Sequence, residues 1–226
     1  MLVHVPGVLT PDDLREFRRE LEAVQWSDGR GSAGYLSQRV KRNQQLPDNH
    51  PLARKLGERI LRALADNPLF TAAALPLKIL PPLFNRYDDS ETYGRHVDGA
   101  IRPISGTPLR VRTDLSATLF LCDPDSYEGG ELEVEDTYGP RHIKLPAGDL
   151  VLYPGTSVHR VLPVTQGTRL ASFFWIQSMV REDHKRSMLF ELDRAIQRAA
   201  TDHPGQEALT DLAGVYHNLL RLWADT

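Results

Sequence analysis

The chain has 226 residues, of which 41% are hydrophobic and 25% are charged, so it is long enough to bury the core of a globular domain. Its formal net charge is −3, and the sequence has no long run of basic residues that could form a positively charged surface for a phosphate backbone. We therefore expect no nucleic acid partner. No stretch has the roughly 18 consecutive apolar residues of a membrane span, and the N-terminus lacks the pattern of a secretion signal. We therefore expect no membrane contact and a cytoplasmic location.

Two amphipathic helices are predicted in the first third of the chain. The segment Thr10-Pro11-Asp12-Asp13 combines a capping hydroxyl, a proline at the first helical position and acids in the first turn. The apolar residues that follow it recur at helical spacing: Leu14, Phe17, Leu21 and Val24. A second helix should begin near Pro51 and end before Asn67-Pro68, with an apolar stripe formed by Leu52, Leu56, Ile60 and Leu64.

From Leu77 the pattern changes to short apolar or alternating runs separated by Gly, Pro and Asp, which predicts antiparallel β-structure. Helical spacing returns near Val180 and is interrupted at His203-Pro204-Gly205. We expect a mainly β chain with helices, of the α+β class. It would comprise a helical support region (1–76), a β core (77–178) and a helical extension (179–226). The apolar stripes of the extension should buttress the core or form a homodimer contact.

The segment YGRHVDGA at residues 93–100 contains a candidate pair of metal ligands. Residues i and i+2 of an extended segment point the same way, so His96 and Asp98 can reach one ion, and Gly94 and Gly99 would let the backbone bend around them. In a chain with 8 histidines and 30 acids, an acid two residues after some histidine is expected about once by chance. The pair therefore needs distant partners.

The distant candidates are His159, on a predicted strand, and Arg169, on the next one. Two imidazoles and one carboxylate on one face of iron(II) leave the opposite face open for an organic chelator and O2. If the chelator is 2-oxoglutarate, its far carboxylate needs a buried cation, and the planar fork of Arg169 is suited to that role. We therefore predict His96, Asp98 and His159 as catalytic metal ligands and Arg169 as the co-substrate-binding residue.

The expected geometry of His159 and Arg169 is that of adjacent strands in one hairpin, which turns near Thr165-Gln166-Gly167. A two-residue turn would place the two side chains on opposite sides of the sheet, whereas an odd loop or a bulge would place them on the same side. With a three-residue loop they would lie roughly 13 Å apart along the sheet. A short diacid and two side chains can bridge that distance.

The chain resembles a known family over nearly its whole length. The phrases PLFNRYDDSETYGRHVDGA, DLSATLFL, YEGGELEVED, AGDLVLYPGTSVHRVLPVTQGTRLASFFWIQSMVR and VYHNLLRLW resemble those of the bacterial PKHD-type hydroxylases, in the prolyl 4-hydroxylase-like branch of the Fe(II)/2-oxoglutarate dioxygenases. The resemblance implies a double-stranded β-helix, or jelly roll. It also implies Fe(2+) at His96, Asp98 and His159, 2-oxoglutarate at Arg169, L-ascorbate as the agent that rescues over-oxidised iron, and a possible link to iron uptake.

The function expected from these residues and the resemblance is hydroxylation of an unidentified small-molecule or amino-acyl substrate by O2, with release of succinate and CO2. A non-catalytic iron or 2-oxoglutarate sensor on the same barrel is the alternative. A zinc hydrolase is the poorer one, because no general base is evident and Arg169 would have no purpose.

Several other side chains have both a structural and a functional interpretation. Tyr87 could donate a hydrogen bond to the co-substrate, although a half-buried strand tyrosine is the commoner case. Phe173, Phe174 and Trp175 should be mostly core, with alternate members lining the pocket, and Cys122 should be a small core residue. Solvated loop charges are favoured over substrate steering for four arginines: Arg95, Arg102, Arg110 and Arg112.

Overall fold

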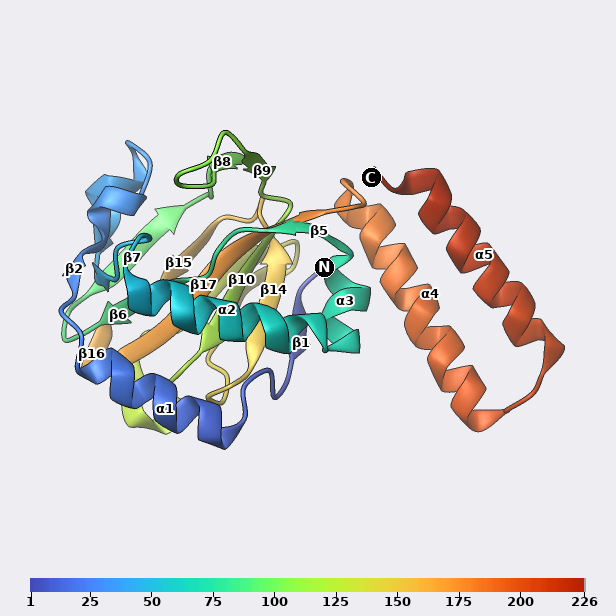
Figure 1. Cartoon of the computed structure of the whole chain (residues 1–226), viewed down its shortest axis with the longest axis horizontal. Helices are drawn as coiled ribbons and strands as arrows, with labels where there is room; N and C mark the ends of the chain where they lie inside the picture. The colour runs from blue at the N-terminus through green and yellow to red at the C-terminus, as the bar shows by residue number, and fades with distance from the viewer. Residues whose placement is uncertain (226) are drawn as a thin grey trace.

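The computed structural model describes residues 1–225 and consists of two facing β-sheets, a layer of helices on one of them and a C-terminal helical hairpin (Figure 1). The large sheet has eight strands. In spatial order these are β1 (Val3–Val5), β14 (Leu150–Pro154), β10 (Leu115–Phe120), β17 (Arg169–Ser178), β6 (Leu83–Tyr87), β4 (Gln44–Gln45) and β2 (Ser27–Asp28), with β5 (Pro76–Ile79) paired to β17.

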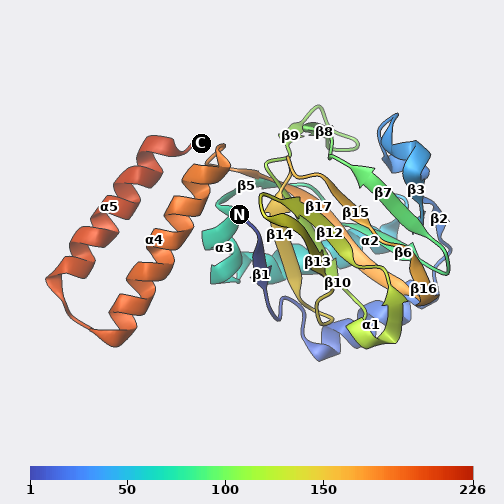
Figure 2. The same ribbon diagram turned by 180° about the vertical axis from the view of Figure 1, so that it is seen from behind.

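The small sheet lies behind the large one in Figure 1 and in front of it in Figure 2. Its strands, in spatial order, are β13 (Gly139–Ile143), β12 (Leu132–Asp136), β15 (His159–Val161), β7 (Thr92–His96) and β3 (Lys41–Arg42). Two short ribbons complete the β-structure: β8 (Ile101–Pro103) with β9 (Arg110–Arg112), and β11 (Tyr127–Gly129) with β16 (Val164–Gly167). All pairings are antiparallel, as predicted, and the arrangement is the expected jelly roll.

The helices are α1 (Pro11–Glu22), α2 (Pro51–Ala65), α3 (Pro68–Ala74), α4 (Asp183–Asp202) and α5 (Glu207–Trp223), with short 3-10 turns at Gly29–Ser32, Ser37–Val40 and Pro124–Ser126. The predicted start of α1 is confirmed, because Thr10 and Asp13 form a reciprocal capping box. The predicted helix from Pro51 and the break at residues 203–205 are confirmed as well. The helix α3 and the short strands of the first 45 residues were not predicted.

No helix among residues 1–225 is both long and apolar enough to span a membrane.

Strand β17 shows how side-chain alternation divides the interior in two. Leu170, Phe174 and Ile176 belong to the apolar core that the large sheet shares with α1, α2 and α3. The alternate residues Arg169 and Phe173 point the other way, into the space between the sheets. One face of the large sheet therefore packs on the helices. The other faces the small sheet, where part of it forms a second apolar cluster and part lines a cavity.

The hairpin of α4 and α5 projects from the end of β17, away from the barrel (Figures 1 and 2). It packs on α3 through a small apolar cluster centred on Leu75, Val180 and Leu189. Part of α5 remains uncovered, with Val215 and Leu222 among the exposed apolar side chains. The extension thus contacts the core at its base, and the homodimer contact stays a prediction.

Replacing Phe17 by alanine tests the helix layer. The ring is fully buried and lies 6.5 Å from the Phe84 ring across the contact between α1 and the large sheet. Its removal should lower the free energy of unfolding by about 3–5 kcal/mol, because the lost contacts leave a cavity. Denaturant titration of Phe17→Ala and of the exposed control Tyr138→Ala measures this. Equal stability of the two variants would contradict this packing.

Candidate functional site

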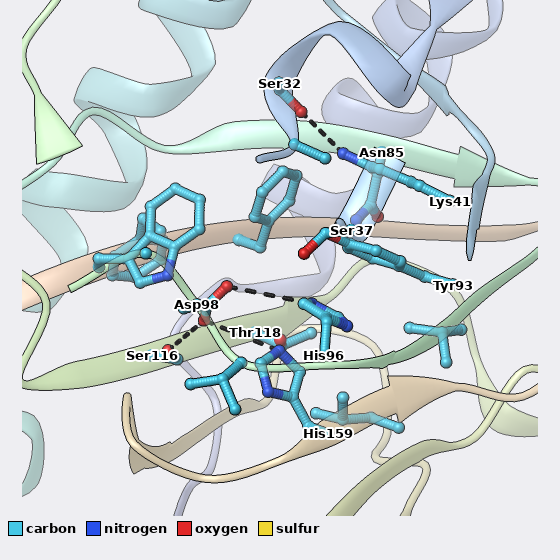
Figure 3. Close-up of a pocket in the computed structure, with 18 of the residues that line it drawn as sticks. Ser32, Ser37, Lys41, Asn85, Tyr93, His96, Asp98, Ser116, Thr118 and His159 are labelled. Carbon is cyan, nitrogen blue, oxygen red and sulfur yellow. Dashed lines mark hydrogen bonds and ion pairs between the residues drawn. The ribbon is translucent and has the colours of Figure 1, made fainter. Parts of the chain in front are cut away.

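The space between the sheets contains a cavity whose walls come from both of them and from the turn at Gly29–Ser32. Three side chains that the sequence predicts as metal ligands meet in it (Figure 3). His96 and His159 are direct partners in the register of β7 and β15, and Asp98 follows β7 by two residues. One ligand atom from each of the three lies within 4.8 Å of the others. The predicted convergence of these residues is therefore present.

Backbone carbonyls orient both imidazoles. Nδ1 of His96 lies 2.8 Å from the carbonyl oxygen of Gly94, and Nδ1 of His159 lies 3.0 Å from that of Ser157. Because a carbonyl can only accept, Nδ1 must carry the proton in each ring, which leaves the Nε2 lone pair free. Both Nε2 atoms face the Asp98 carboxylate, at 4.0 Å for His96 and 3.7 Å for His159.

Asp98 is itself held in place from the large sheet. The Ser116 hydroxyl on β10 donates a 2.6 Å hydrogen bond to Asp98 Oδ2, so a residue of one sheet orients a ligand that follows a strand of the other. Hydrogen bonds of this kind to metal-binding carboxylates fix their direction and raise metal affinity. No sequence pattern distinguishes Ser116, which is one of several serines on apolar strands.

Burial sets the protonation state of the first imidazole. The low-polarity surroundings of His96, together with the neighbouring His159, lower its pKa to about 4. The ring is therefore neutral at pH 7 and able to bind a metal ion through Nε2.

The three donors fit a single transition-metal ion. Two ligands on one ion with bonds of about 2.1 Å can be at most about 4.2 Å apart. His96 Nε2 lies 4.0 Å from Asp98 Oδ1 and His159 Nε2 lies 3.7 Å from Asp98 Oδ2, so each imidazole is within that limit of one carboxylate oxygen. Two imidazole nitrogens and one carboxylate oxygen are the donor set of iron(II) oxygenases that leave coordination positions open. Gly94 helps to close the site, since a Cβ there would lie 2.8 Å from the Val40 side chain, whereas a Cβ on Gly99 would meet nothing within 4 Å.

The hairpin geometry predicted for His159 and Arg169 is wrong. β15 pairs with β12 and β7 in the small sheet, whereas β17 pairs with β10 and β6 in the large one. The intervening β16 pairs with β11, so the chain crosses from one sheet to the other between the two residues. His159 and Arg169 therefore line one cavity from opposite walls instead of from neighbouring strands of one sheet.

Arg169 is buried without a counter-charge. Its side chain is almost fully inaccessible, its Nε and Nη1 atoms have no hydrogen-bond partner, and it forms no ion pair with any residue of the described chain. The guanidinium carbon lies 5.3 Å from the centre of the Tyr87 ring, on the neighbouring strand. A buried and unpaired guanidinium is costly, which indicates that an anion belongs beside it. The Tyr87 hydroxyl is also buried and unpartnered, and burial raises its pKa.

The four arginines expected to be solvated differ from one another. Arg95 pairs with Glu135, Arg112 pairs with Asp114 at 2.6 Å, and Arg110 is exposed. Arg102 instead lines the cavity, with its guanidinium carbon 3.9 Å from the centre of the Trp175 ring. The prediction of a solvated side chain is therefore wrong for Arg102.

Lys41, which no sequence pattern had indicated, also lines the cavity. It stands in the polar segment KRNQQ, where no periodicity separates a buried lysine from a solvated one. Phe173 and Trp175 line the same cavity, and so does the intervening Phe174, which also belongs to the main core; the expected alternation is therefore incomplete. Cys122 is partly buried against the main core, and burial raises its pKa.

Comparison with known families gives two matches along the chain. Residues 82–177 match the model of the 2OG-Fe(II) oxygenase superfamily, and residues 183–225 match the PKHD-type hydroxylase C-terminal domain. The first match contains the three predicted metal ligands and Arg169, and the second covers the helical hairpin.

Individual proteins agree with these matches. The chain is 59% identical to a PKHD-type hydroxylase of Bordetella pertussis over 225 residues, which is 100% of both chains. A prolyl-4-hydroxylase structure from Pseudomonas putida shares the fold, with a TM-score of 0.52, 22% identity and coverage of 78% of this chain and 92% of that one. The structure of HygX from Streptomyces hygroscopicus, solved with nickel, 2-oxoglutarate and hygromycin B, shares the fold as well. Its TM-score is 0.53 at 17% identity, and the match covers 78% of this chain and 82% of HygX. The chain therefore belongs to the PKHD-type hydroxylases of the 2OG-Fe(II) oxygenase superfamily, and it is a dioxygenase.

Proposed function

We propose that the chain binds Fe(2+) through His96, Asp98 and His159, holds 2-oxoglutarate through Arg169, and hydroxylates a small-molecule or amino-acyl substrate with release of succinate and CO2. The observation that supports this most directly is that three converging donors and the buried, unpaired guanidinium of Arg169 line a single cavity. A metal ion would account for the three donors, and an anion that also chelates this ion would account for the buried guanidinium.

The role proposed for the protein is to hold the reactants in fixed positions. When bound, iron(II) would supply the redox chemistry that couples decarboxylation of 2-oxoglutarate by O2 to insertion of an oxygen atom into a substrate C–H bond. The carbonyl-anchored imidazoles and the Ser116–Asp98 hydrogen bond keep three ligands on one side, so the other side remains open. Arg169 would bind the distal carboxylate and thereby turn the ketoacid end toward the ligands.

Tyr87 is proposed to assist Arg169. Its hydroxyl lies inside the protein without a hydrogen-bond partner, and its strand is directly paired with that of Arg169. A raised pKa keeps the phenol protonated, so it can donate to a carboxylate oxygen.

The family resemblance suggests two further parts of this proposal. L-ascorbate would reduce over-oxidised iron, and the protein would have a role in iron uptake.

Loss of one imidazole tests the activity. His96→Ala should reduce bound iron by roughly 100-fold or more at a fixed metal concentration, because a direct ligand matters at least as much as its hydrogen-bond partners. Untargeted profiling of metabolites and peptides in air, with iron, 2-oxoglutarate and ascorbate, should show succinate and products one oxygen heavier with the wild type only. His142→Ala, on the outer strand β13, is the matched control and should behave as the wild type.

Two results would go against this. Succinate formation that survives His96→Ala would remove the metal assignment. A wild type that shows the iron–ketoacid absorption band without oxygen, yet makes no succinate in air with any substrate pool, would be a sensor instead of an enzyme.

Loss of the buried guanidinium tests the co-substrate assignment. Arg169→Met should weaken 2-oxoglutarate binding roughly 30-fold or more, since removing one partner of a buried charged pair costs about 2–5 kcal/mol. Anaerobic titration of the iron–ketoacid band measures this. Pyruvate, which lacks the distal carboxylate, should bind both proteins alike. Arg160→Met is the control, because the partly exposed Arg160 pairs with Glu133 outside the cavity, and this variant should retain wild-type affinity. An equal loss for pyruvate would mean that Arg169 does not recognise that carboxylate.

The lowered pKa of His96 predicts a pH dependence of stability for the metal-free protein. Between the ordinary value of 6.5 and about 4, the unfolded chain binds a proton at this residue that the folded chain does not. The free energy of unfolding should therefore fall as the pH drops through that window, by up to about 3 kcal/mol. Denaturant titrations with a chelator at pH 7 and pH 5 should show about 2 kcal/mol of this change. His96→Gln should flatten this part of the profile, and an unchanged slope would mean that another group causes the loss of stability.

A further inference from the structure

The cavity has a second cationic wall, separate from Arg169, formed by Lys41 of β3 and Arg102 of β8. In Figure 3, Lys41 lies across the cavity from His159 and beside Ser32. The proposed chemistry at the metal ligands and at Arg169 does not use these two side chains.

Lys41 is a buried ammonium group that donates two hydrogen bonds, both to neutral groups. Its side chain has an exposed fraction of 3%, and Nζ donates to Ser32 Oγ at 2.7 Å and to Gln45 Oε1 at 3.0 Å. Nζ also lies 5.2 Å from the centre of the Tyr93 ring. An ammonium group has three donors, so one remains for a ligand. Burial, followed by the charge of Arg102, lowers the pKa of Lys41 to about 8.

Arg102 stacks against Trp175 at the mouth of the cavity. Its one hydrogen bond to the protein is a 3.3 Å contact from Nη2 to the carbonyl oxygen of Ser32. Stacking fixes the plane of the guanidinium and leaves its edge free to bind an oxyanion. Arg102 also lines two surface grooves next to the cavity, so its free edge can be reached from outside.

No acid of the described chain forms an ion pair with either cation, although Asp28 and Asp48 line a surface groove together with Arg102. Asp98 is the one carboxylate among the residues that line the cavity, and within residues 1–225 neither Lys41 nor Arg102 forms an ion pair. Their neighbours Arg95 and Arg112 both have acidic partners. A purely structural role for the pair would not need two positive charges, because a neutral polar or apolar side chain could close the cavity at a lower desolvation cost.

Binding of iron and 2-oxoglutarate would not remove this excess. The ketoacid dianion and Asp98 together carry three negative charges, and iron(II) and Arg169 together carry three positive ones. The loaded centre is therefore neutral, and Lys41 and Arg102 keep the cavity positive. In surroundings of low polarity such an excess favours an anionic ligand over a neutral one of the same shape.

We propose that Lys41 and Arg102 form an anion subsite for the substrate to be hydroxylated, and that this substrate carries a carboxylate. The planar edge of Arg102 and the remaining donor of Lys41 would bind its oxygens, and a C–H bond elsewhere in the molecule would lie over the metal ligands. The inference rests on the proposed dioxygenase function and adds the substrate class to it.

The experiment uses the full chain loaded with iron and 2-oxoglutarate. A small-molecule extract of bacterial cells is separated on an anion exchanger into a retained, anionic fraction and an unretained fraction. Binding is read without oxygen as a change in the iron–ketoacid absorption band, and turnover in air as succinate and products one oxygen heavier. The retained fraction should produce both effects, and the oxidised compound should contain a carboxylate.

Two variants and one control assign the effect to the subsite. Arg102→Gln and Lys41→Met should each raise the amount of retained fraction needed for half the band change roughly tenfold or more. Arg110→Gln is the matched control, because Arg110 is exposed on the same ribbon, opposite Pro103, and should leave the response unchanged. Thermal unfolding confirms that each variant is folded, and Arg102→Gln keeps the test valid if the buried Lys41 cannot be replaced.

The outcomes separate the two proposals. If the band forms with iron and 2-oxoglutarate but only the unretained fraction changes it, the anion subsite is wrong and the dioxygenase function stands. The same holds if Arg102→Gln responds like Arg110→Gln, or if the oxidised compound carries only a phosphate or no acid at all. If no band forms with iron and 2-oxoglutarate, the dioxygenase proposal fails, together with the subsite that rests on it.

Discussion

Charge compensation in the space between the two sheets is the constraint on which the site depends. Asp98, Arg169 and Lys41 are all withdrawn from water there, and none of them has an ion-pair partner of ordinary geometry within the described chain. Buried charges of this kind destabilise a fold unless ligands neutralise them. Two apolar clusters offset this cost: one joins the large sheet to three helices, and the other lies between the two sheets beside the cavity.

The positions of the donors follow from strand pairing. The register of β7 and β15 places the two histidines opposite each other, and a bond from each ring to the carbonyl two residues earlier turns Nε2 inward. These features are local consequences of extended backbone, which is why a short pattern, His-x-Asp with a distant histidine, could nominate the three candidate ligands once the family resemblance supported it. The caps and apolar stripes that predicted α1 and α2 are local in the same sense.

What the sequence could not reveal is the path of the chain between the sheets. Nothing in the segment between His159 and Arg169 distinguishes a hairpin from a crossover, because either can turn at a glycine such as Gly167. The burial of Lys41 is also non-local, since it depends on β3 pairing with β7, about fifty residues later in the chain. Arg102 was assigned to solvent because its stacking partner, Trp175, belongs to a different sheet. The resemblance to a known family allowed the fold to be predicted despite these non-local contacts. It did not identify the residues on the substrate side of the site.

The unpaired guanidinium of Arg169 has a consequence for stability if an anion binds there as proposed. A ligand that binds only the native chain adds stability in proportion to the logarithm of its concentration above the dissociation constant. An anion bound by the buried cation would thus stabilise the native chain, and the empty protein would open more often and be cut more readily by proteases. The lifetime of the polypeptide would then depend on the supply of that anion.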